Sequence, residues 1–376
     1  MGDRNKYGYR WRDGYTVILL SNSVIMALLE VKNVRIAGIA ACVPAKVEEN
    51  TDIPVFVEGE AERVIAQTGI ERKHVVSDGM TVSDLCAKAF ETVISELGWE
   101  KESIDVLVLT TAAQDYLVPP TVCIIHGMLG LPERTMTIEL RQGCPGWVIG
   151  MSTLSSMLSN GNMKRGILLC GDIPTLQNSP LDKETRPLFG DAGTATALEY
   201  DENAASLEFD FGSRGKDFKA IWAQQGGMKE PLTEESLKFV EYGENKLRRP
   251  IDVSMDGMSV FSFGFSTAPK SVKSLVEKYN VDLEAIDYLV LHQANHYLNE
   301  KIRKKLKVPA EKVPYSMKDY GNTGSPSIPL TIVSQCSEDF RNKPLDIIAC
   351  AFGVGLAWGS VHFKTDKIVC PPVQLL

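Results

Sequence analysis

The sequence predicts an α/β protein composed of two related halves. The segment IDVLVLTTAA at 104–113 matches IDYLVLHQAN at 286–295 in the same register, at an offset of 182 residues. RGILLCGD at 165–172 and LDIIACAF at 345–352 form a second pair at an offset of 180 residues. Two similar offsets near half of the chain length indicate an internal duplication.

Each half alternates two kinds of segment. Continuous apolar runs such as 106–113 predict strands that are buried on both faces, and the patterns at 81–99 and 269–279 predict helices between such strands. We therefore expect each half to be a mainly parallel sheet flanked by helices. Functional groups gather beyond the carboxyl ends of such strands, and a pseudo-twofold axis brings these ends face to face. The site should draw residues from both halves.

Composition sets the class of protein. The chain has 376 residues, of which 44% are apolar and 23% charged, which is typical of a folded globular protein with a substantial core. A net charge of −8 disfavours nucleic acid and anionic membranes as partners. The eight cysteines are scattered through apolar segments without a C-x-x-C pair, which predicts a reducing, cytoplasmic location.

The first residues differ in character from the rest. Residues 1–25 combine a basic, aromatic start with an apolar run that Ser21, Asn22 and Ser23 interrupt, so the run is too short to span a bilayer. We expect Met26 to be the physiological start and treat 1–33 as an N-terminal extension. The two halves are then 34–205 and 206–376.

One cysteine has a distinctive setting, QGCPGW at 142–147. The preceding TMTIEL predicts a strand and the following WVIGMSTLSSMLSNG a helix, with Pro145 in the first helical turn, where a missing N–H costs nothing. Free backbone amides and the positive end of the helix favour a thiolate, and Gly143 and Gly146 permit close approach of other groups. The elbow therefore predicts that Cys144 is an exposed, activated nucleophile.

Three further motifs lie in the second half. His292 stands where the duplicated segment of the first half has a threonine. A structural role is more common for a histidine at the end of a strand. His296 lies four residues further on, but a metal site formed by these two histidines lacks a third ligand, so we predict no bound metal. GNTGSPSIP at 321–329 predicts a loop that enters a helix, with Asn322 able to present an amide donor. AFGVGLAWGS at 351–360 predicts a close-approach turn with free N–H groups, not a dinucleotide loop.

Together these motifs resemble the β-ketoacyl-ACP synthase III family of the thiolase superfamily. QTGIERKHV (67–75), FGDAGTATAL (189–198) and MDGMSVFSF (255–263) add to the resemblance, which runs from about residue 34 to the end. It implies a thiolase-like, five-layered αβαβα fold with two duplicated halves, in a homodimer.

The resemblance also implies a role for each motif. Cys144 would carry the acyl group as a thioester, while His292 and Asn322 would stabilise the enolate formed when a malonyl thioester loses CO₂. His292 must then be neutral, which a helix beginning after it would favour. The backbone amides of Cys144 and Val354 would form the oxyanion hole. No bound cofactor is implied, because acyl-CoA or acyl-ACP and malonyl-ACP are substrates.

Substrate-binding positions depart from the family pattern. Arg63 and Gln67 occupy the places of the family's adenine-clamping Trp and a nearby Arg, so coenzyme A is in doubt as the primer carrier, although Arg63 remains able to meet a phosphate. Lys183 falls near another basic carrier-binding position. Val118 replaces a Phe at the end of the primer pocket, which would admit a longer or branched chain. The resemblance implies further substrate contacts at Asn295 and Gly353.

The partner that the resemblance implies is an acyl carrier protein. KIRKKLK at 301–307 is a basic run near the proposed entrance, and in an acidic chain it favours docking of an acidic partner there.

Two other functions remain open at this point. Cys144 would also serve a transferase that passes the acyl group to a hydroxyl or amine, with His292 as general base. Asparagine at 322 favours condensation, because a base is better oriented by a carboxylate. A catalytically silent scaffold that pairs with an active synthase is the third reading, and the retention of all three polar groups argues against it.

Overall fold

The computed structural model describes residues 10–12, 15–17, 27–243 and 246–376. Met26 lies outside these residues. Two large sheets form the frame of the protein. The six-stranded sheet has the order β19 (Gln374–Leu375), β4 (Val34–Val43), β10 (Ala192–Tyr200), β9 (Arg165–Asp172), β7 (Val106–Thr110), β8 (Met136–Leu140). The five-stranded sheet has the order β16 (Tyr288–Leu291), β17 (Leu345–Gly353), β18 (Ala357–Thr365), β11 (Leu207–Ser213), β3 (Ala27–Val31).

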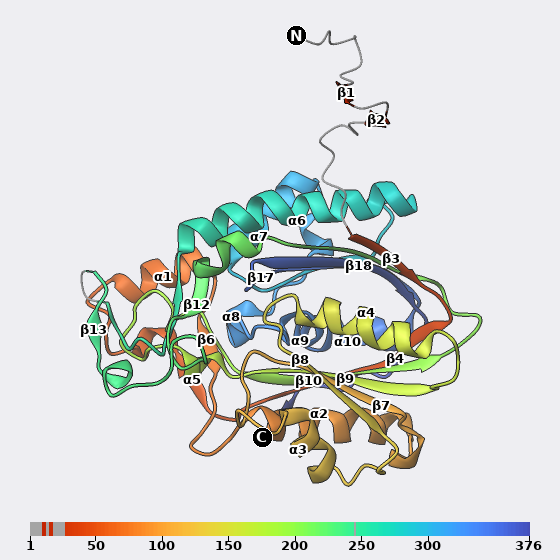
Figure 1. The fold of residues 1–376 in the computed structure, drawn as a ribbon, viewed down its shortest axis with the longest axis horizontal. Helices are drawn as coiled ribbons and strands as arrows, with labels where there is room; N and C mark the ends of the chain where they lie inside the picture. The colour runs from red at the N-terminus through yellow and green to blue at the C-terminus, as the bar shows by residue number, and fades with distance from the viewer. Residues whose placement is uncertain (1–9, 13–14, 18–26, 244–245) are drawn as a thin grey trace.

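Helices cover both sheets and fill the space between them (Figure 1). The outer face of the five-stranded sheet carries α6 (Gly257–Tyr279) and α7 (His296–Leu306); the middle layer holds α4 (Gly146–Leu158), α9 (Ser327–Gln335) and α10 (Ser337–Asn342); the outer face of the six-stranded sheet carries α2 (Val82–Leu97) and α3 (Thr121–Met128). The largest apolar cluster joins the two sheets through α4 and α9, with Trp147 fully buried in it. The prediction of an α/β fold is confirmed.

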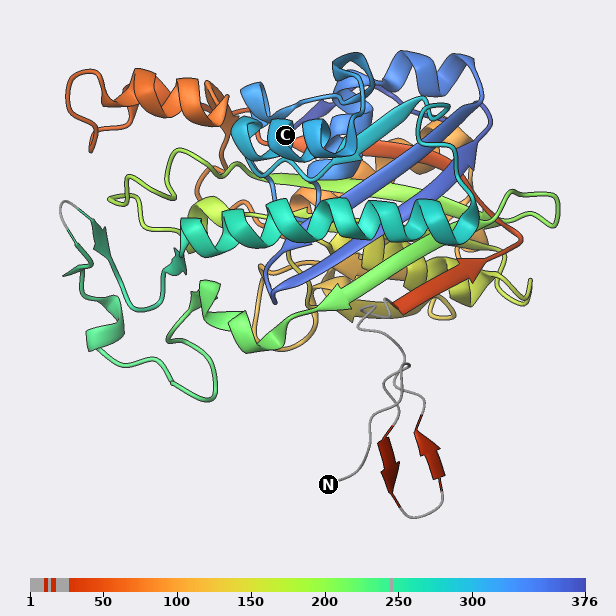
Figure 2. The same cartoon turned by 90° about the horizontal axis from the view of Figure 1, so that it is seen from above.

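The remaining elements lie at the ends of the sheets. They are α1 (Glu60–Thr68), α5 (Pro174–Gln177), α8 (Met317–Tyr320) and the short strand pairs β1 (Arg10–Arg12) with β2 (Tyr15–Val17), β5 (Val47–Glu49) with β6 (Arg72–His74), β12 (Ile221–Ala223) with β15 (Val253–Met255), and β13 (Val240–Glu241) with β14 (Leu247–Arg248). Figure 2 shows α6 across the five-stranded sheet and the segment between β12 and β15 extending from the body beside it.

The repeated segments occupy equivalent places in the two sheets. β7 pairs parallel with β9, and β16 pairs parallel with β17. In each sheet the next two pairings are antiparallel, namely β9 with β10 and β10 with β4, and β17 with β18 and β18 with β11. In the six-stranded sheet β7 also pairs parallel with β8 and β19 with β4, so the expectation of a mainly parallel sheet holds there. It is wrong for the five-stranded sheet, where only β16 and β17 are paired parallel. The three residues 354–356 between β17 and β18 are too few for a parallel crossover, so these strands must run antiparallel.

The strands near the two ends of the chain pair with different sheets. β3, which the predicted division assigns to the N-terminal extension, pairs with β11 of the five-stranded sheet, while β19 at the C-terminus pairs with β4 of the six-stranded sheet. The N-terminal extension thus supplies a strand to the sheet of the second half, and the second half supplies one to the sheet of the first half. The domain limits at 33 and 205 remain a prediction.

Candidate active site

A cavity of about 1280 Å³ lies where strands of the two sheets end. Cys144, His292 and Asn322 all line it, together with Gly353 and Val354. Cys144 comes from the first half and the others come from the second. The structure therefore brings the three predicted reactive side chains to one space.

Cys144 lies at the turn from β8 into α4, as predicted. Pro145 is the N-cap of α4, and the thiol residue is only 8% exposed. A Cβ on Gly353 would lie 2.5 Å from the Cys144 sulfur, and one on Gly146 would lie 2.9 Å from the Ser325 Cβ. Glycine is required at both positions because neighbouring chain segments pack directly against the elbow.

The protonation state of Cys144 differs from the expectation. Burial raises the pKa of the thiol to about 11, although the backbone N–H groups of Val354 and of Cys144 itself act in the opposite direction. The prediction of an exposed thiolate is wrong for the resting protein, because desolvation of the charge outweighs the hydrogen bonds offered to it. The thiol is neutral at pH 7 and must lose its proton during attack. Both backbone N–H groups nevertheless meet at its sulfur.

His292 directly follows β16 and is buried. Its Nδ1 lies 2.7 Å from the Ser327 hydroxyl oxygen, and its ring packs edge-on against Phe352. Burial lowers the pKa of His292 to about 3, so the expected neutral imidazole is confirmed. The expected cause is corrected: burial keeps the ring neutral, and α7 begins only at His296, after the N-cap residue Asn295.

Asn322 is fixed by bonds on both its backbone and its side chain. Its N–H donates to the Leu188 carbonyl at 2.8 Å, and its Oδ1 accepts from the Gly324 N–H at 3.0 Å. Among the described residues no partner is found for its side-chain nitrogen. The carboxamide is therefore oriented by its oxygen and keeps its N–H groups for a ligand.

Sequence reasoning missed Asp172, the residue at the end of β9. Its carboxylate accepts from the Ala112 N–H at 2.7 Å and from both the N–H and the hydroxyl of Ser325 at 2.7 Å. It thereby ties the Asn322 loop to the first half of the chain. Burial raises the pKa of Asp172 to about 6. An acid after a buried apolar strand was the available signal, but the partner 153 residues away was not visible.

The predicted substrate-binding residues divide into two groups. Lys183, Asn295 and Gly353 line the cavity. Arg63 is exposed outside it and donates from Nε to the Gly59 carbonyl at 3.0 Å, while Val118 is 81% exposed on the loop before α3. Neither Arg63 nor Val118 meets the cavity of its own chain.

The described residues contain no cluster of three metal-ligating side chains, and no described helix is both long and apolar enough to cross a bilayer.

The chain is similar to known proteins over most of its length. Residues 138–215 match the family model of 3-oxoacyl-[acyl-carrier-protein] synthase III, and residues 276–365 match the model of its C-terminal part. The β-ketoacyl-[acyl-carrier-protein] synthase III of Lactococcus lactis is 30% identical, covering 87% of this chain and 97% of its own, and that of Streptococcus agalactiae is 29% identical, covering 88% and 98%. A crystal structure of a 3-oxoacyl-(acyl-carrier protein) synthase from Burkholderia xenovorans superposes with a TM-score of 0.87 at 29% identity, covering 93% of this chain and 99% of its own.

Proposed function

The chain belongs to the 3-oxoacyl-[acyl-carrier-protein] synthase III family, and on this premise we propose how its residues carry out the condensation. The protein is an acyltransferase that joins an acyl primer to a malonyl thioester. The observation that carries the proposal is the single cavity in which a thiol, a neutral imidazole and an oriented carboxamide meet. The steps and residue roles below are proposals that this geometry supports.

The first step transfers the primer to Cys144. The sulfur attacks the thioester carbonyl while its proton passes to His292, and that proton then goes to the departing carrier thiolate. The N–H groups of Cys144 and Val354 hold the oxyanion, because both already face the sulfur. A neutral His292 is required here, since an imidazolium has no free lone pair to accept the proton.

The second step forms the carbon–carbon bond. The malonyl thioester loses CO₂, and the electrons of the broken bond form an enolate whose oxygen accepts hydrogen bonds from His292 and Asn322. The enolate carbon attacks the acyl carbonyl, the bond from that carbon to the Cys144 sulfur breaks, and the leaving thiolate takes a proton from solvent water. Ser327 at Nδ1 of His292 serves both steps, because its hydroxyl accepts from an Nδ1–H or donates to a bare Nδ1.

Mixing the protein with acyl primers, with and without malonyl-ACP, tests the function itself. We expect CO₂ release and a product two carbons longer than the primer only when malonyl-ACP is present. Acylation of the protein without either result, across a broad panel of primers, would indicate simple acyl transfer.

The partners and setting form part of the proposal. An acidic carrier protein would dock on the basic segment 301–307 beside the cavity-lining residue Tyr297. A homodimer would give Val118 its role: because this side chain is exposed and does not line the cavity of its own chain, it would enter the cavity of a second copy. Tyr116 and Leu117 on the same loop are 65% and 71% exposed, and β8 is an unpaired sheet edge, as expected of an interface.

The fold and location are proposed on related grounds. The order of helix and sheet layers and the equivalent strand pairings support two thiolase-like halves derived from one duplication. All eight cysteines are free thiols, which supports a reducing, cytoplasmic compartment.

The neutral state of His292 predicts an acid-sensitive stability. The folded protein resists protonating this ring down to about pH 3, whereas the unfolded chain takes up the proton below about pH 6.5. Stability from this residue is therefore present above pH 6.5 and lost as pH falls. In the wild type the free energy of unfolding should therefore decrease from pH 8 to pH 5. In His292→Gln this decrease should be smaller by about 2 kcal/mol, as measured by urea denaturation at the two pH values. His126→Gln, a half-buried histidine outside the cavity, is the control, and an equal effect in both variants would contradict the assignment.

A further inference from the structure

Lys183 is the cation on the α1 side of the cavity, and the carboxylate of Glu60 already neutralises its charge. Lys183 Nζ donates to Glu60 Oε2 at 2.7 Å, and the same carboxylate oxygen accepts the Val57 N–H at 2.9 Å. Glu60 lies in the first turn of α1, where a carboxylate is favoured, and the Lys183 ammonium lowers its pKa. Glu60 is thus a prearranged, charged partner for Lys183.

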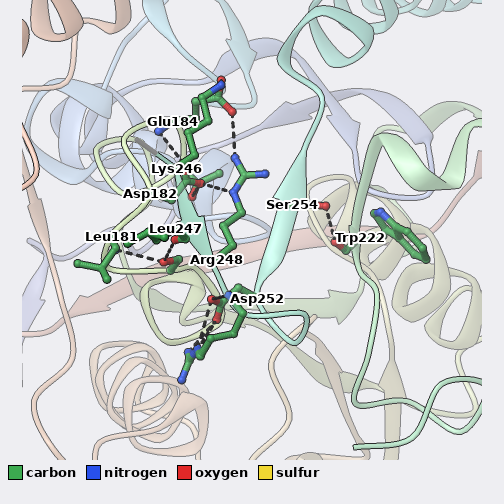
Figure 3. A network of polar contacts seen from close by, with 12 residues as sticks. Leu181, Asp182, Glu184, Trp222, Lys246, Leu247, Arg248, Asp252 and Ser254 are labelled. Atoms are coloured by element: carbon green, nitrogen blue, oxygen red, sulfur yellow. Dashed lines mark hydrogen bonds and ion pairs between the residues drawn. The ribbon is translucent and has the colours of Figure 1, made fainter. Parts of the chain in front are cut away.

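The loop that carries Lys183 is held on both sides (Figure 3). Arg248 of β14 contacts Asp182 at 2.8 Å and Glu184 at 2.9 Å, and the Ser179 hydroxyl donates to the Leu247 carbonyl at 2.6 Å. Asp182 is fully buried in this network. Lys183 therefore has little freedom to leave Glu60 and meet a ligand phosphate.

The rest of α1 offers no replacement cation. Val64, Gln67 and Thr68 line the cavity and are neutral, while Glu58 and Glu62 are exposed near the start of the helix. Arg63 points outside the cavity. Among described cavity-lining residues the other cation is Arg141, which is three residues from Cys144 in the sequence and does not belong to the α1 side of the cavity. A coenzyme A nucleotide, with its three phosphates, would meet mainly neutral and acidic groups at this rim.

In the described part of the chain, cations without a carboxylate partner lie instead just before β12 and on α7. Lys219 sits over Trp222, Lys301 over Tyr297 and Lys305 over Phe265, and none of these lysines has a carboxylate partner among the described residues. Trp222 and Tyr297 line the cavity, so Lys219 and Lys301 lie at its border. Cations spread over two elements suit an extended acidic surface better than one nucleotide.

We propose that the primer reaches Cys144 on the phosphopantetheine arm of an acidic carrier protein, and that Glu60 discriminates against coenzyme A thioesters by holding Lys183. This inference rests on the proposed function, because it names the donor for the acylation of Cys144. Its specificity-determining residue is Glu60.

The test compares donors that carry one acyl chain on three carriers: ACP, coenzyme A and free 4′-phosphopantetheine. The readout is kcat/KM for acylation of Cys144, followed by intact mass. We expect kcat/KM for acyl-ACP to exceed the values for the other two donors by about tenfold or more. The values for acyl-CoA and acyl-phosphopantetheine should agree within about threefold, because the nucleotide of coenzyme A makes no favourable contact at this rim. A Lys301→Glu, Lys305→Glu double variant should lower only the acyl-ACP value.

Glu60→Gln should release Lys183 and raise kcat/KM for acyl-CoA about threefold to tenfold, with a smaller gain for acyl-phosphopantetheine, which has one phosphate where coenzyme A has three. Glu62→Gln makes the same charge change on the same helix, but Glu62 has no recorded ion pair among the described residues, so no gain is expected. The inference is overturned if wild-type acyl-CoA exceeds acyl-phosphopantetheine about tenfold, or if Glu60→Gln and Glu62→Gln behave alike. Failure of every donor to acylate Cys144 would instead refute the proposed function, which separates the two outcomes.

Discussion

Replacing Cys144 with alanine is expected to abolish both acylation and condensation, lowering kcat by about 10⁴ or more. The reason is that no other described cysteine lines the cavity, so the covalent route has no substitute. The fold should survive, because the change removes one sulfur atom from a small side chain. Condensation is measured as steady-state product formation, and acylation as the intact mass after incubation with acyl-ACP. Circular dichroism tests whether the fold is kept.

Cys123 provides the matched control for this variant. It is a free, exposed thiol on α3 and does not line the cavity, so Cys123→Ala should retain wild-type acylation. If Cys144→Ala still accumulated an acyl group, or still formed product above about 1% of the wild-type rate, the assigned nucleophile would be wrong.

Replacing Asn322 with alanine is expected to separate the two steps. Acylation of Cys144 should stay near the wild-type rate, because its oxyanion hole consists of backbone N–H groups. Decarboxylation and condensation should fall by about 10²–10³, the usual cost of losing one preorganised donor to an oxyanion. Single-turnover acylation and CO₂ release, measured on the same preparation, give the two rates.

Thr323→Val controls for disturbance of the same loop. The Thr323 hydroxyl is buried without a recorded partner among the described residues, so replacing it with a methyl group should change neither rate. Asn322→Asp should be no better than alanine, since a carboxylate repels the enolate. Equal losses of acylation and condensation in Asn322→Ala would mean that the residue is merely structural.

The elements were predictable where one local signal sufficed. The continuous apolar runs 106–110 and 288–291 became buried strands, and Pro145 after a strand placed Cys144 at the start of a helix. The repeat then brought the ends of these strands together, so the shared cavity followed from spacing alone. These signals are local or repeated, and they need no knowledge of packing.

Strand direction and protonation depended on information that local patterns lack. An apolar run such as 345–353 reads the same in a parallel or an antiparallel sheet, and only the short turn at 354–356 distinguishes them. The neutral Cys144 follows from burial by layers far apart in the sequence, which outweighs the local amides. Asp172 and Ser327 acquire their roles from contacts 153 and 35 residues away.

The most direct test of the central claim is a pulse–chase with peptide mapping. Protein mixed briefly with labelled acyl-ACP, quenched and digested, should carry the label on Cys144 alone, and a chase with malonyl-ACP should move that label into a 3-oxoacyl product with one CO₂ released per label lost. A label on another residue, or a product that forms faster than labelled Cys144 decays, would contradict the account.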